Sequence, residues 1–152
     1  MLDIVKKHLA AISLSNWNDC RATLATDAVF EDVPVRQRVQ GAEQCIDAIR
    51  AWKATFPDLK ATVTRGYAIG ERVVCEVEWE GTQSGPLEGI FGTLPPTHKR
   101  SRVRAIIVFM LRGGKIIEAR HFYDMLTVLN QLGVQPTVSN AKPGPRVEAV
   151  RL

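Results

Sequence analysis

Residues 99–123, KRSRVRAIIVFMLRGGKIIEARHFY, decide the fold. Lys99 to Leu111 and Lys115 to Tyr123 are two strand candidates. In the first, Arg102 and Arg104 alternate with Val103 and Ala105 before an apolar run, and in the second, Glu118 and Arg120 alternate with Ala119 and His121. A period of two is typical of a strand with one covered face. The Gly113-Gly114 pair between the two runs supplies the turn chemistry of a hairpin. The stretch therefore predicts two strands that are antiparallel neighbours in a sheet.

The rest of the chain divides into helical and extended segments. Apolar residues recur every three or four positions near the N-terminus, and alternate later in the chain. We expect helices from Leu2 to Leu14, from about Trp17 to Ala25, from Gly41 until Pro57 ends it, and from Asp124 to Gly133. We expect further strands over Ala28 to Pro34, Leu59 to Ile69 and Arg72 to Ser84, and a long irregular connection over Gly85 to His98.

This order of segments predicts an α+β fold. Its sheet is mixed or antiparallel and strongly curved, and packs on three helices to form a cone. A bent sheet and straight helices leave space between them, so we expect an apolar pocket at the open end. The predicted domain covers residues 1–133. Residues 134–152 contain Pro136, Pro143 and Pro145 and are expected to form a flexible C-terminal tail.

Composition narrows the class of protein. The chain has 152 residues, 45% of them hydrophobic, and a formal net charge of +4. It has no dense basic cluster for nucleic acid and no apolar run as long as the roughly 18 residues of a membrane span. Cys20, Cys45 and Cys75 are widely spaced, which favours buried thiols in a reducing compartment over a disulfide or metal role. We therefore expect a cytoplasmic protein whose partners include neither nucleic acid nor a membrane.

Motifs for cofactors and metals are missing from the sequence. It contains no glycine-rich phosphate loop, no Gly-x-Ser-x-Gly, no dinucleotide fingerprint and no pair of histidines at metal spacing. Any enzyme of this sequence is expected to carry out acid/base chemistry without a cofactor or metal.

Strand alternation assigns side chains to the two faces of the sheet. Val77 and Trp79 share one face of their strand, and Ile107 and Phe109 share one face of theirs, so these four are expected to line the pocket. The opposite faces carry charges that can pair between strands, namely Glu76, Glu78, Glu80, Arg102, Arg104 and Arg120. Those arginines form either an anion clamp or a salt-bridged outer surface.

His121 is the titratable side chain that alternation places on the covered face of a core strand. An imidazole suits proton transfer near neutral pH, so His121 is either a catalytic base or a core histidine bonded to a carbonyl. His8, on the first helix, and His98, beside a basic run, are weaker candidates.

Three more residues have two possible roles each. Asp124 either caps the last helix or orients His121. Asp32 either contributes a carboxylate to the pocket or belongs to a turn. Tyr123 either is a plain core aromatic or donates a hydrogen bond to a substrate oxygen. We predict His121, Asp124 and Asp32 as catalytic, with Tyr123 among the substrate-binding residues.

Four stretches resemble the SnoaL-like polyketide cyclase family of the nuclear-transport-factor-2-like superfamily. They are WEGTQSGP at 79–86, PPTHKR at 95–100, GKIIEARHFYD at 114–124 and LNQLG at 129–133, and the resemblance runs from about Val5 to Gly133. It implies the cone-shaped fold, and a homodimer that forms through the outer sheet face. It does not single out an activity, because the superfamily holds cyclases, isomerases, epoxide hydrolases, hydroxylase-like proteins and non-catalytic binders.

The residues of the family's sites match in part. The founding cyclases use an aspartate on the last strand as general acid/base. The resemblance places His121 at that aspartate and Asp124 at a second acid. A histidine of those cyclases falls at Ile107, and the Arg-x-Asp part of the epoxide-hydrolase constellation is missing after Arg104.

Two functions therefore follow from the sequence. The first is an enzyme that removes a proton beside a carbonyl of an apolar, polyketide-like substrate, leading to aldol closure, isomerisation or a hydroxylase-type step. The second is a non-catalytic module of the same fold that binds a small molecule or takes part in an assembly.

Overall fold

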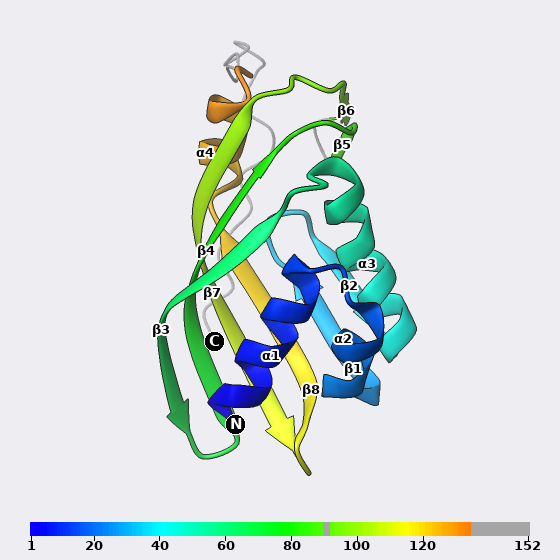
Figure 1. Cartoon of the computed structure of the whole chain (residues 1–152), viewed down its shortest axis with the longest axis vertical. Helices are drawn as coiled ribbons and strands as arrows, with labels where there is room; N and C mark the ends of the chain where they lie inside the picture. The colour runs from blue at the N-terminus through cyan, green and yellow to red at the C-terminus, as the bar shows by residue number, and fades with distance from the viewer. Residues whose placement is uncertain (90–91, 135–152) are drawn as a thin grey trace, which may run out of the picture.

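The computed structural model describes residues 1–89 and 92–134 (Figure 1), so the predicted tail over 134–152 lies, apart from Val134, outside the described residues. This part of the chain forms four helices and eight strands. The helices are α1 (Leu2–Ser13), α2 (Trp17–Thr23), α3 (Ala42–Thr55) and α4 (Met125–Gln131). The strands are β1 (Leu24–Asp32), β2 (Gln37–Gln40), β3 (Lys60–Ile69), β4 (Arg72–Thr82), β5 (Leu87–Gly89), β6 (Gly92–Leu94), β7 (Arg100–Arg112) and β8 (Lys115–Tyr123).

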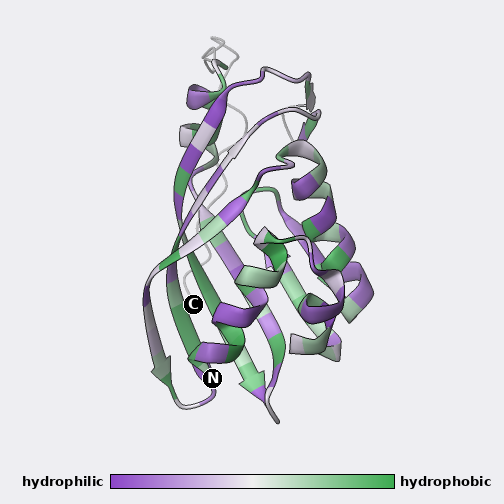
Figure 2. Cartoon of the chain, viewed as in Figure 1, coloured by the Kyte–Doolittle hydropathy of each residue, from purple (hydrophilic) through white to green (hydrophobic). Residues whose placement is uncertain are grey.

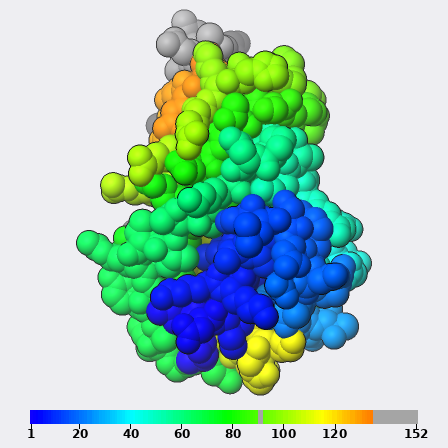
Figure 3. All heavy atoms as spheres, viewed as in Figure 1, coloured from blue at the N-terminus to red at the C-terminus, as the bar shows by residue number. Residues whose placement is uncertain are grey.

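Six of the strands form one mixed sheet in the order β2-β1-β8-β7-β4-β3. Neighbours are antiparallel except β1 and β8, which run parallel. Helices α1, α2 and α3 cover one face of the curved sheet, and α4 lies beyond the end of β8 (Figure 1). In the space-filling view, α1 and α2 hide the sheet behind them (Figure 3). The predicted α+β fold is confirmed.

The hairpin of β7 and β8 forms where the sequence predicts it. Gly113 and Gly114 have φ of 56° and 73° between the paired residues Arg112 and Lys115. Two consecutive positive φ values define a type I′ turn, whose twist matches that of the strands it joins.

Several boundaries differ from the predictions. The second helix ends at Thr23, and β1 starts at Leu24 because the Leu24 backbone is already extended. The sequence analysis missed β2, which has only four residues, and treated β5 and β6 as irregular chain. Such short strands leave too few residues to show a period of two.

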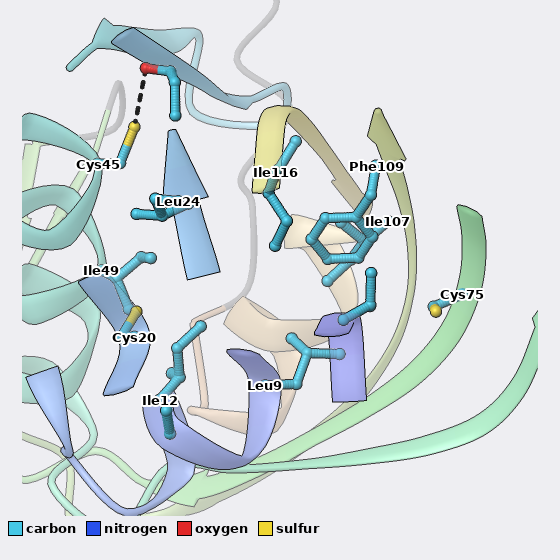
Figure 4. Packing of buried hydrophobic residues seen from close by; sticks show 14 of the residues in the cluster. Leu9, Ile12, Cys20, Leu24, Cys45, Ile49, Cys75, Ile107, Phe109 and Ile116 are labelled. Atoms are coloured by element: carbon cyan, nitrogen blue, oxygen red, sulfur yellow. Dashed lines mark hydrogen bonds between the residues drawn. The ribbon is translucent and has the colours of Figure 1, made fainter. Parts of the chain in front are cut away.

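Buried apolar side chains from both layers form the main core (Figure 4). Along the strands, hydrophobic residues alternate with hydrophilic ones (Figure 2). Strict alternation counted back from His121 and Ala119 predicts Ile117 on the covered face. In the structure Ile116 is fully buried and Ile117 only partly, because the β7–β8 register changes between Met110 and Leu111. The three cysteines are buried and free, and Cys45 donates a hydrogen bond to the Ala28 carbonyl (Figure 4).

A second, smaller cluster lies beside the connection between β4 and β7. Leu87 of β5 packs there with Phe56, Val128 and Leu132. The connection is thus anchored on side chains from α3 and α4. None of the helices described here is long and apolar enough to cross a membrane.

The fully buried side chain of Gln83 stabilises the connection between β4 and β7. Its Nε2 donates to the carbonyls of Gly85, Leu94 and Pro95, at 3.1, 3.3 and 3.2 Å. Its Oε1 accepts from the Thr97 backbone N–H at 3.1 Å and from the Thr97 hydroxyl at 2.6 Å. One amide therefore satisfies both ends of the loop that carries β5 and β6.

Replacing the Gln83 amide should lower the free energy of unfolding. Gln83→Leu leaves buried carbonyls and an N–H without partners, each worth about 1 to 3 kcal/mol. We expect a loss of at least about 3 kcal/mol in the free energy of unfolding, measured by urea titration. Gln44→Leu, at an exposed position of α3, is the control and should change stability by less than about 0.5 kcal/mol. Equal effects of the two substitutions would contradict the role given to Gln83.

Candidate active site

An apolar cavity lies between the sheet and the helices. Its volume is about 90 Å³, counted as space open to the centre of a water molecule. A single water needs about 10 to 15 Å³ on that measure, so there is room for a small organic molecule. Of the predicted site residues, Trp79, Ile107, Phe109, His121 and Tyr123 line it.

The register of the sheet brings Asp32 beside His121. Asp32 on β1 pairs with His121 on β8, which pairs in turn with Ile107 on β7. Residues directly opposite each other in neighbouring strands have their side chains on the same face. The two polar groups therefore occupy one row, on the face that the helices cover.

The Asp32 side chain is fully buried. Its Oδ2 accepts a hydrogen bond from the indole N–H of Trp52 at 2.9 Å, and its Oδ1 has no partner within the described residues. Burial raises the pKa of Asp32 to about 6, and the hydrogen bond from Trp52 opposes that rise. Asp32 does not itself line the cavity; the lining residues Trp52, His121 and Tyr123 stand around it.

Tyr123 carries the second polar atom without a partner, its buried hydroxyl oxygen. Its ring lies 4.7 Å from that of His121 and 5.9 Å from that of Trp52, between centroids. Burial, followed by the nearby Asp32 carboxylate, raises the pKa of Tyr123. The hydroxyl and the carboxyl are close enough to affect each other's pKa, although their geometry is not that of a hydrogen bond. The hydroxyl therefore stays protonated and can act as a donor.

His121 also has an indole partner. The Nε1–H of Trp79 lies 3.1 Å from His121 Nε2. An indole nitrogen can only donate, so Nε2 accepts, and in the neutral ring the proton is on Nδ1. Burial lowers the pKa of His121 to about 3, so the ring is neutral around pH 7. His121 thus offers a hydrogen-bond donor, Nδ1–H, rather than a free lone pair.

Asp124 occupies the cap position that the sequence analysis left open. Its side chain is exposed, Oδ1 accepts from the Leu126 N–H at 2.9 Å, and Oδ2 accepts from the Thr127 hydroxyl at 2.5 Å. These bonds lower its pKa. Within the described residues it makes no hydrogen bond to His121. The structure therefore brings Asp32, not Asp124, to the histidine.

Val77 is buried in the main core and is not among the residues that line the cavity. Its partner across the strands is Ala105 on β7, whereas Trp79, two residues further along β4, reaches His121.

The outer face of the sheet carries ion pairs between neighbouring strands, as predicted for Glu78 and Arg102. Arg102 binds Glu78 at 2.6 Å, and Arg100, which the sequence analysis did not single out, binds Glu80 at 3.0 Å. Glu80 also borders the cavity, next to Trp79. Of the three predicted arginines, Arg102 thus has the salt-bridged role, and Arg104 and Arg120 form no ion pair within the described residues.

Two cavity residues were underestimated from the sequence. Trp52 belongs to the apolar face of the helix predicted from Gly41 to Pro57, together with Ile46, Ile49 and Phe56, and nothing in a single sequence shows that its N–H meets Asp32. His8 was ranked low, although it shares a helix face with Val5, Leu9 and Ile12. That spacing was the available signal, and His8 indeed lines the cavity and is 4% exposed. Within the described residues, no three His, Cys, Asp or Glu side chains are grouped to hold a metal ion.

Comparison with known proteins identifies the family of the chain. The family model described as SnoaL-like polyketide cyclase matches residues 2–132, so the chain belongs to that family. The resemblance stated from the sequence is thereby confirmed. A search of curated proteins found no match.

Solved structures share the fold. A proposed SnoaL-like polyketide cyclase from Jannaschia sp. CCS1 is 25% identical with a TM-score of 0.78, over 89% of this chain and 92% of that one. IdmH, a proposed polyketide cyclase from Streptomyces antibioticus, is 25% identical with a TM-score of 0.74, over 87% and 97%. An epoxide hydrolase of the LEH-like type from M. tuberculosis is 19% identical with a TM-score of 0.68, over 86% of each chain. The same fold thus occurs in proteins described with different activities.

The buried histidines predict that the protein loses stability in acid. Burial lowers the pKa of His8 to about 4 and of His121 to about 3, both from 6.5. Below pH 6.5 these histidines bind protons in the unfolded chain but not in the folded chain, so the free energy of unfolding decreases as the pH is lowered. Asp32, whose pKa is raised from 3.8 to about 6, acts in the opposite direction below pH 6. At 1.36 kcal/mol per pKa unit, we expect a net loss of about 2 kcal/mol between pH 7 and pH 5.

Urea titrations at the two pH values measure this loss. The His121→Phe variant should lose less than half as much stability as the wild type between pH 7 and pH 5. Only His8 then destabilises the fold in acid, and Asp32 still acts in the opposite direction. His98→Asn is the control at an exposed position with φ of 58°, which Asn tolerates, and should behave as the wild type. A stability that is the same at pH 7 and pH 5 would show that the histidines are not buried as described.

Proposed function

We propose that the protein is a cofactor-independent acid/base enzyme that acts on an apolar, polyketide-like carbonyl compound. The observation that carries the proposal is a fully buried carboxyl group, Asp32, with an unpartnered oxygen beside an apolar cavity. Its pKa of about 6 suits a base that works near neutral pH.

A carboxylate is a costly choice at this position if its role is structural. Asparagine would accept the same hydrogen bond from Trp52 without placing a charge in an apolar interior. The rise in pKa corresponds to about 2 to 3 kcal/mol of lost stability when Asp32 is ionised. Such a cost is common where a group has a catalytic task.

The proton can be followed through the proposed reaction. Asp32 takes a proton from the carbon next to the substrate carbonyl, and the C–H electron pair becomes the enolate. The enolate oxygen accepts hydrogen bonds from the Tyr123 hydroxyl and from His121 Nδ1–H, both of which are donors at neutral pH. Asp32 then returns its proton to another carbon in an isomerisation, or to the alkoxide formed by aldol closure. No proton is gained or lost overall.

For this reaction, the Asp32 carboxyl must reach the cavity that Trp52, His121 and Tyr123 now separate from it. Catalytic hydrogen bonds are often long or misaligned before the substrate binds. Rotation of the Asp32 and Tyr123 side chains is the movement that the proposal requires. It does not use His121 as the base, because Trp79 occupies the Nε2 lone pair.

The apolar walls support the proposed substrate class. A cavity lined by Ile107, Phe109 and Trp79 favours a ring compound with few polar atoms. Holding a flexible chain folded would supply the rest of the rate for a closure. The proposal includes the expected cytoplasmic location and a homodimer through the outer face, where Ile106 and Phe122 are 40% and 37% exposed.

Asp32→Asn separates catalysis from stability. With 2-tetralone in D2O as a carbon-acid probe, we expect the wild type to accelerate exchange of the protons next to the carbonyl, measured by proton NMR. The variant should lose at least about 10²-fold of that acceleration, the usual contribution of a positioned base. At pH 8 it should also be more stable than the wild type by about 2 kcal/mol, because no charge is buried.

The two results together identify the role of Asp32. A less stable and inactive variant would point to a structural carboxylate. The proposal that Asp32 is the base would be wrong if Asp32→Asn exchanged the protons of 2-tetralone at the wild-type rate. It would also be wrong if the wild type did not accelerate the exchange.

The indole partners provide a matched pair of variants. Trp52→Phe removes the hydrogen bond that favours ionised Asp32, so the acid limb of kcat/KM should move from about pH 6 upward by one to two units. Trp79→Phe removes the bond to His121 instead and should leave that limb in place. Exchange rates of the probe over pH 4 to 9 measure both. A limb that moves equally in the two variants would argue against Asp32 as the titrating base.

A further inference from the structure

His8 is a second buried imidazole in the cavity, and the proposed reaction does not use it. It is 4% exposed, lines the cavity, and meets the ring of Phe109 edge-on at 6.2 Å between centroids. Phe109 pairs with Ala119, which lies two residues before His121 on β8. Two residues of strand span about 7 Å, so His8 lies about that far along the cavity from the row of Asp32 and His121.

The neighbours of His8 determine which of its nitrogens carries the proton. The Thr23 hydroxyl donates its hydrogen to the Cys20 carbonyl at 2.6 Å. Thr23 Oγ1 can then only accept from His8 Nδ1, 2.7 Å away, so Nδ1 is the protonated nitrogen. In the neutral ring Nε2 is therefore an acceptor, and it has no hydrogen-bond partner within the described residues. Burial lowers the pKa of His8 to about 4, which keeps this form at neutral pH.

We propose that the cavity is a binding site with two separate polar contacts, in which His8 Nε2 accepts a hydrogen bond from a ligand hydroxyl remote from the reacting carbonyl. The donor is a neutral hydroxyl, because the walls near His8 are the apolar Leu9, Ile12 and Phe109, and no charge among them would pair with an ammonium group. The ligand class is then a fused-ring ketone with a phenolic hydroxyl on the distant ring. The location of the carbonyl rests on the proposed function, whereas the hydroxyl contact is a matter of binding alone.

Three ketones that differ at one position test the contact: 2-tetralone, 6-hydroxy-2-tetralone and 6-methoxy-2-tetralone. Their binding is measured by quenching of the fluorescence of Trp52 and Trp79, which both line the cavity. We expect the hydroxy compound to bind about fivefold to tenfold more tightly than the methoxy compound, the effect of one buried hydrogen bond. His8→Phe should abolish this preference while binding 2-tetralone within about twofold of the wild type.

His121→Phe is the matched control at the other polar contact. It should weaken binding of all three ketones by a similar factor and keep the preference for the hydroxyl. Should His8→Phe fail to fold, the 15N chemical shift of His8 Nε2 in the wild type replaces it. That shift should move to lower frequency with the hydroxy ketone and stay unchanged with the methoxy ketone.

Several outcomes would overturn the inference: equal binding of the hydroxy and methoxy compounds, a preference that survives in His8→Phe, or no quenching by any of the three. Failure of the proposed catalysis is distinct, because Asp32→Asn with full exchange activity would leave the hydroxyl preference as it was. Loss of exchange in Asp32→Asn together with equal binding would refute the role of His8 alone.

Discussion

Asp32 and His121 lie side by side because β1 runs parallel to β8. A parallel pair cannot be closed by a tight turn, so the chain completes α3 and the strands β3 to β7 before β8 returns next to β1. Helix α3 crosses the covered face on the way and brings the Trp52 N–H to the Asp32 carboxyl. The carboxyl, its hydrogen-bond donor and the histidine thus come from three distant parts of the chain. The position of the site depends on this one pairing.

Asp32 and His121 each bind one indole N–H, and each keeps a second polar atom that the indole does not contact. Trp52 satisfies one oxygen of Asp32, and Trp79 satisfies one nitrogen of His121. The remaining Asp32 oxygen is an acceptor, and the remaining His121 nitrogen is a donor. An apolar interior strengthens such interactions and raises the cost of leaving them unmade. The different hydrogen-bond partners of Asp32 and His121 therefore leave one of them as an acceptor and the other as a donor. The sequence alone does not show this difference.

The sequence predicted more of the fold than of the site. β8 has its predicted bounds, and the alternation of β7 and β8 assigns Ile107, Phe109 and His121 to the covered face, where the structure has them. Local periodicity carries this information because it depends on neighbouring residues alone. The Asp32–Trp52 bond joins residues from a strand and a helix, and no local pattern reports it. The cap role of Asp124 could be named from the sequence, because its capping bonds to Leu126 and Thr127 are local.

The central claim is that Asp32 is a buried carboxyl group whose pKa is matched to proton transfer near neutral pH. Titration of its 13Cγ resonance by NMR, assigned by comparison with Asp32→Asn, measures that pKa directly. The account predicts a midpoint near pH 6, well above the 3.8 of an ordinary aspartate. A midpoint at or below pH 4 would contradict it, because an ordinary carboxylate in that place would be neither strained by burial nor suited as the base.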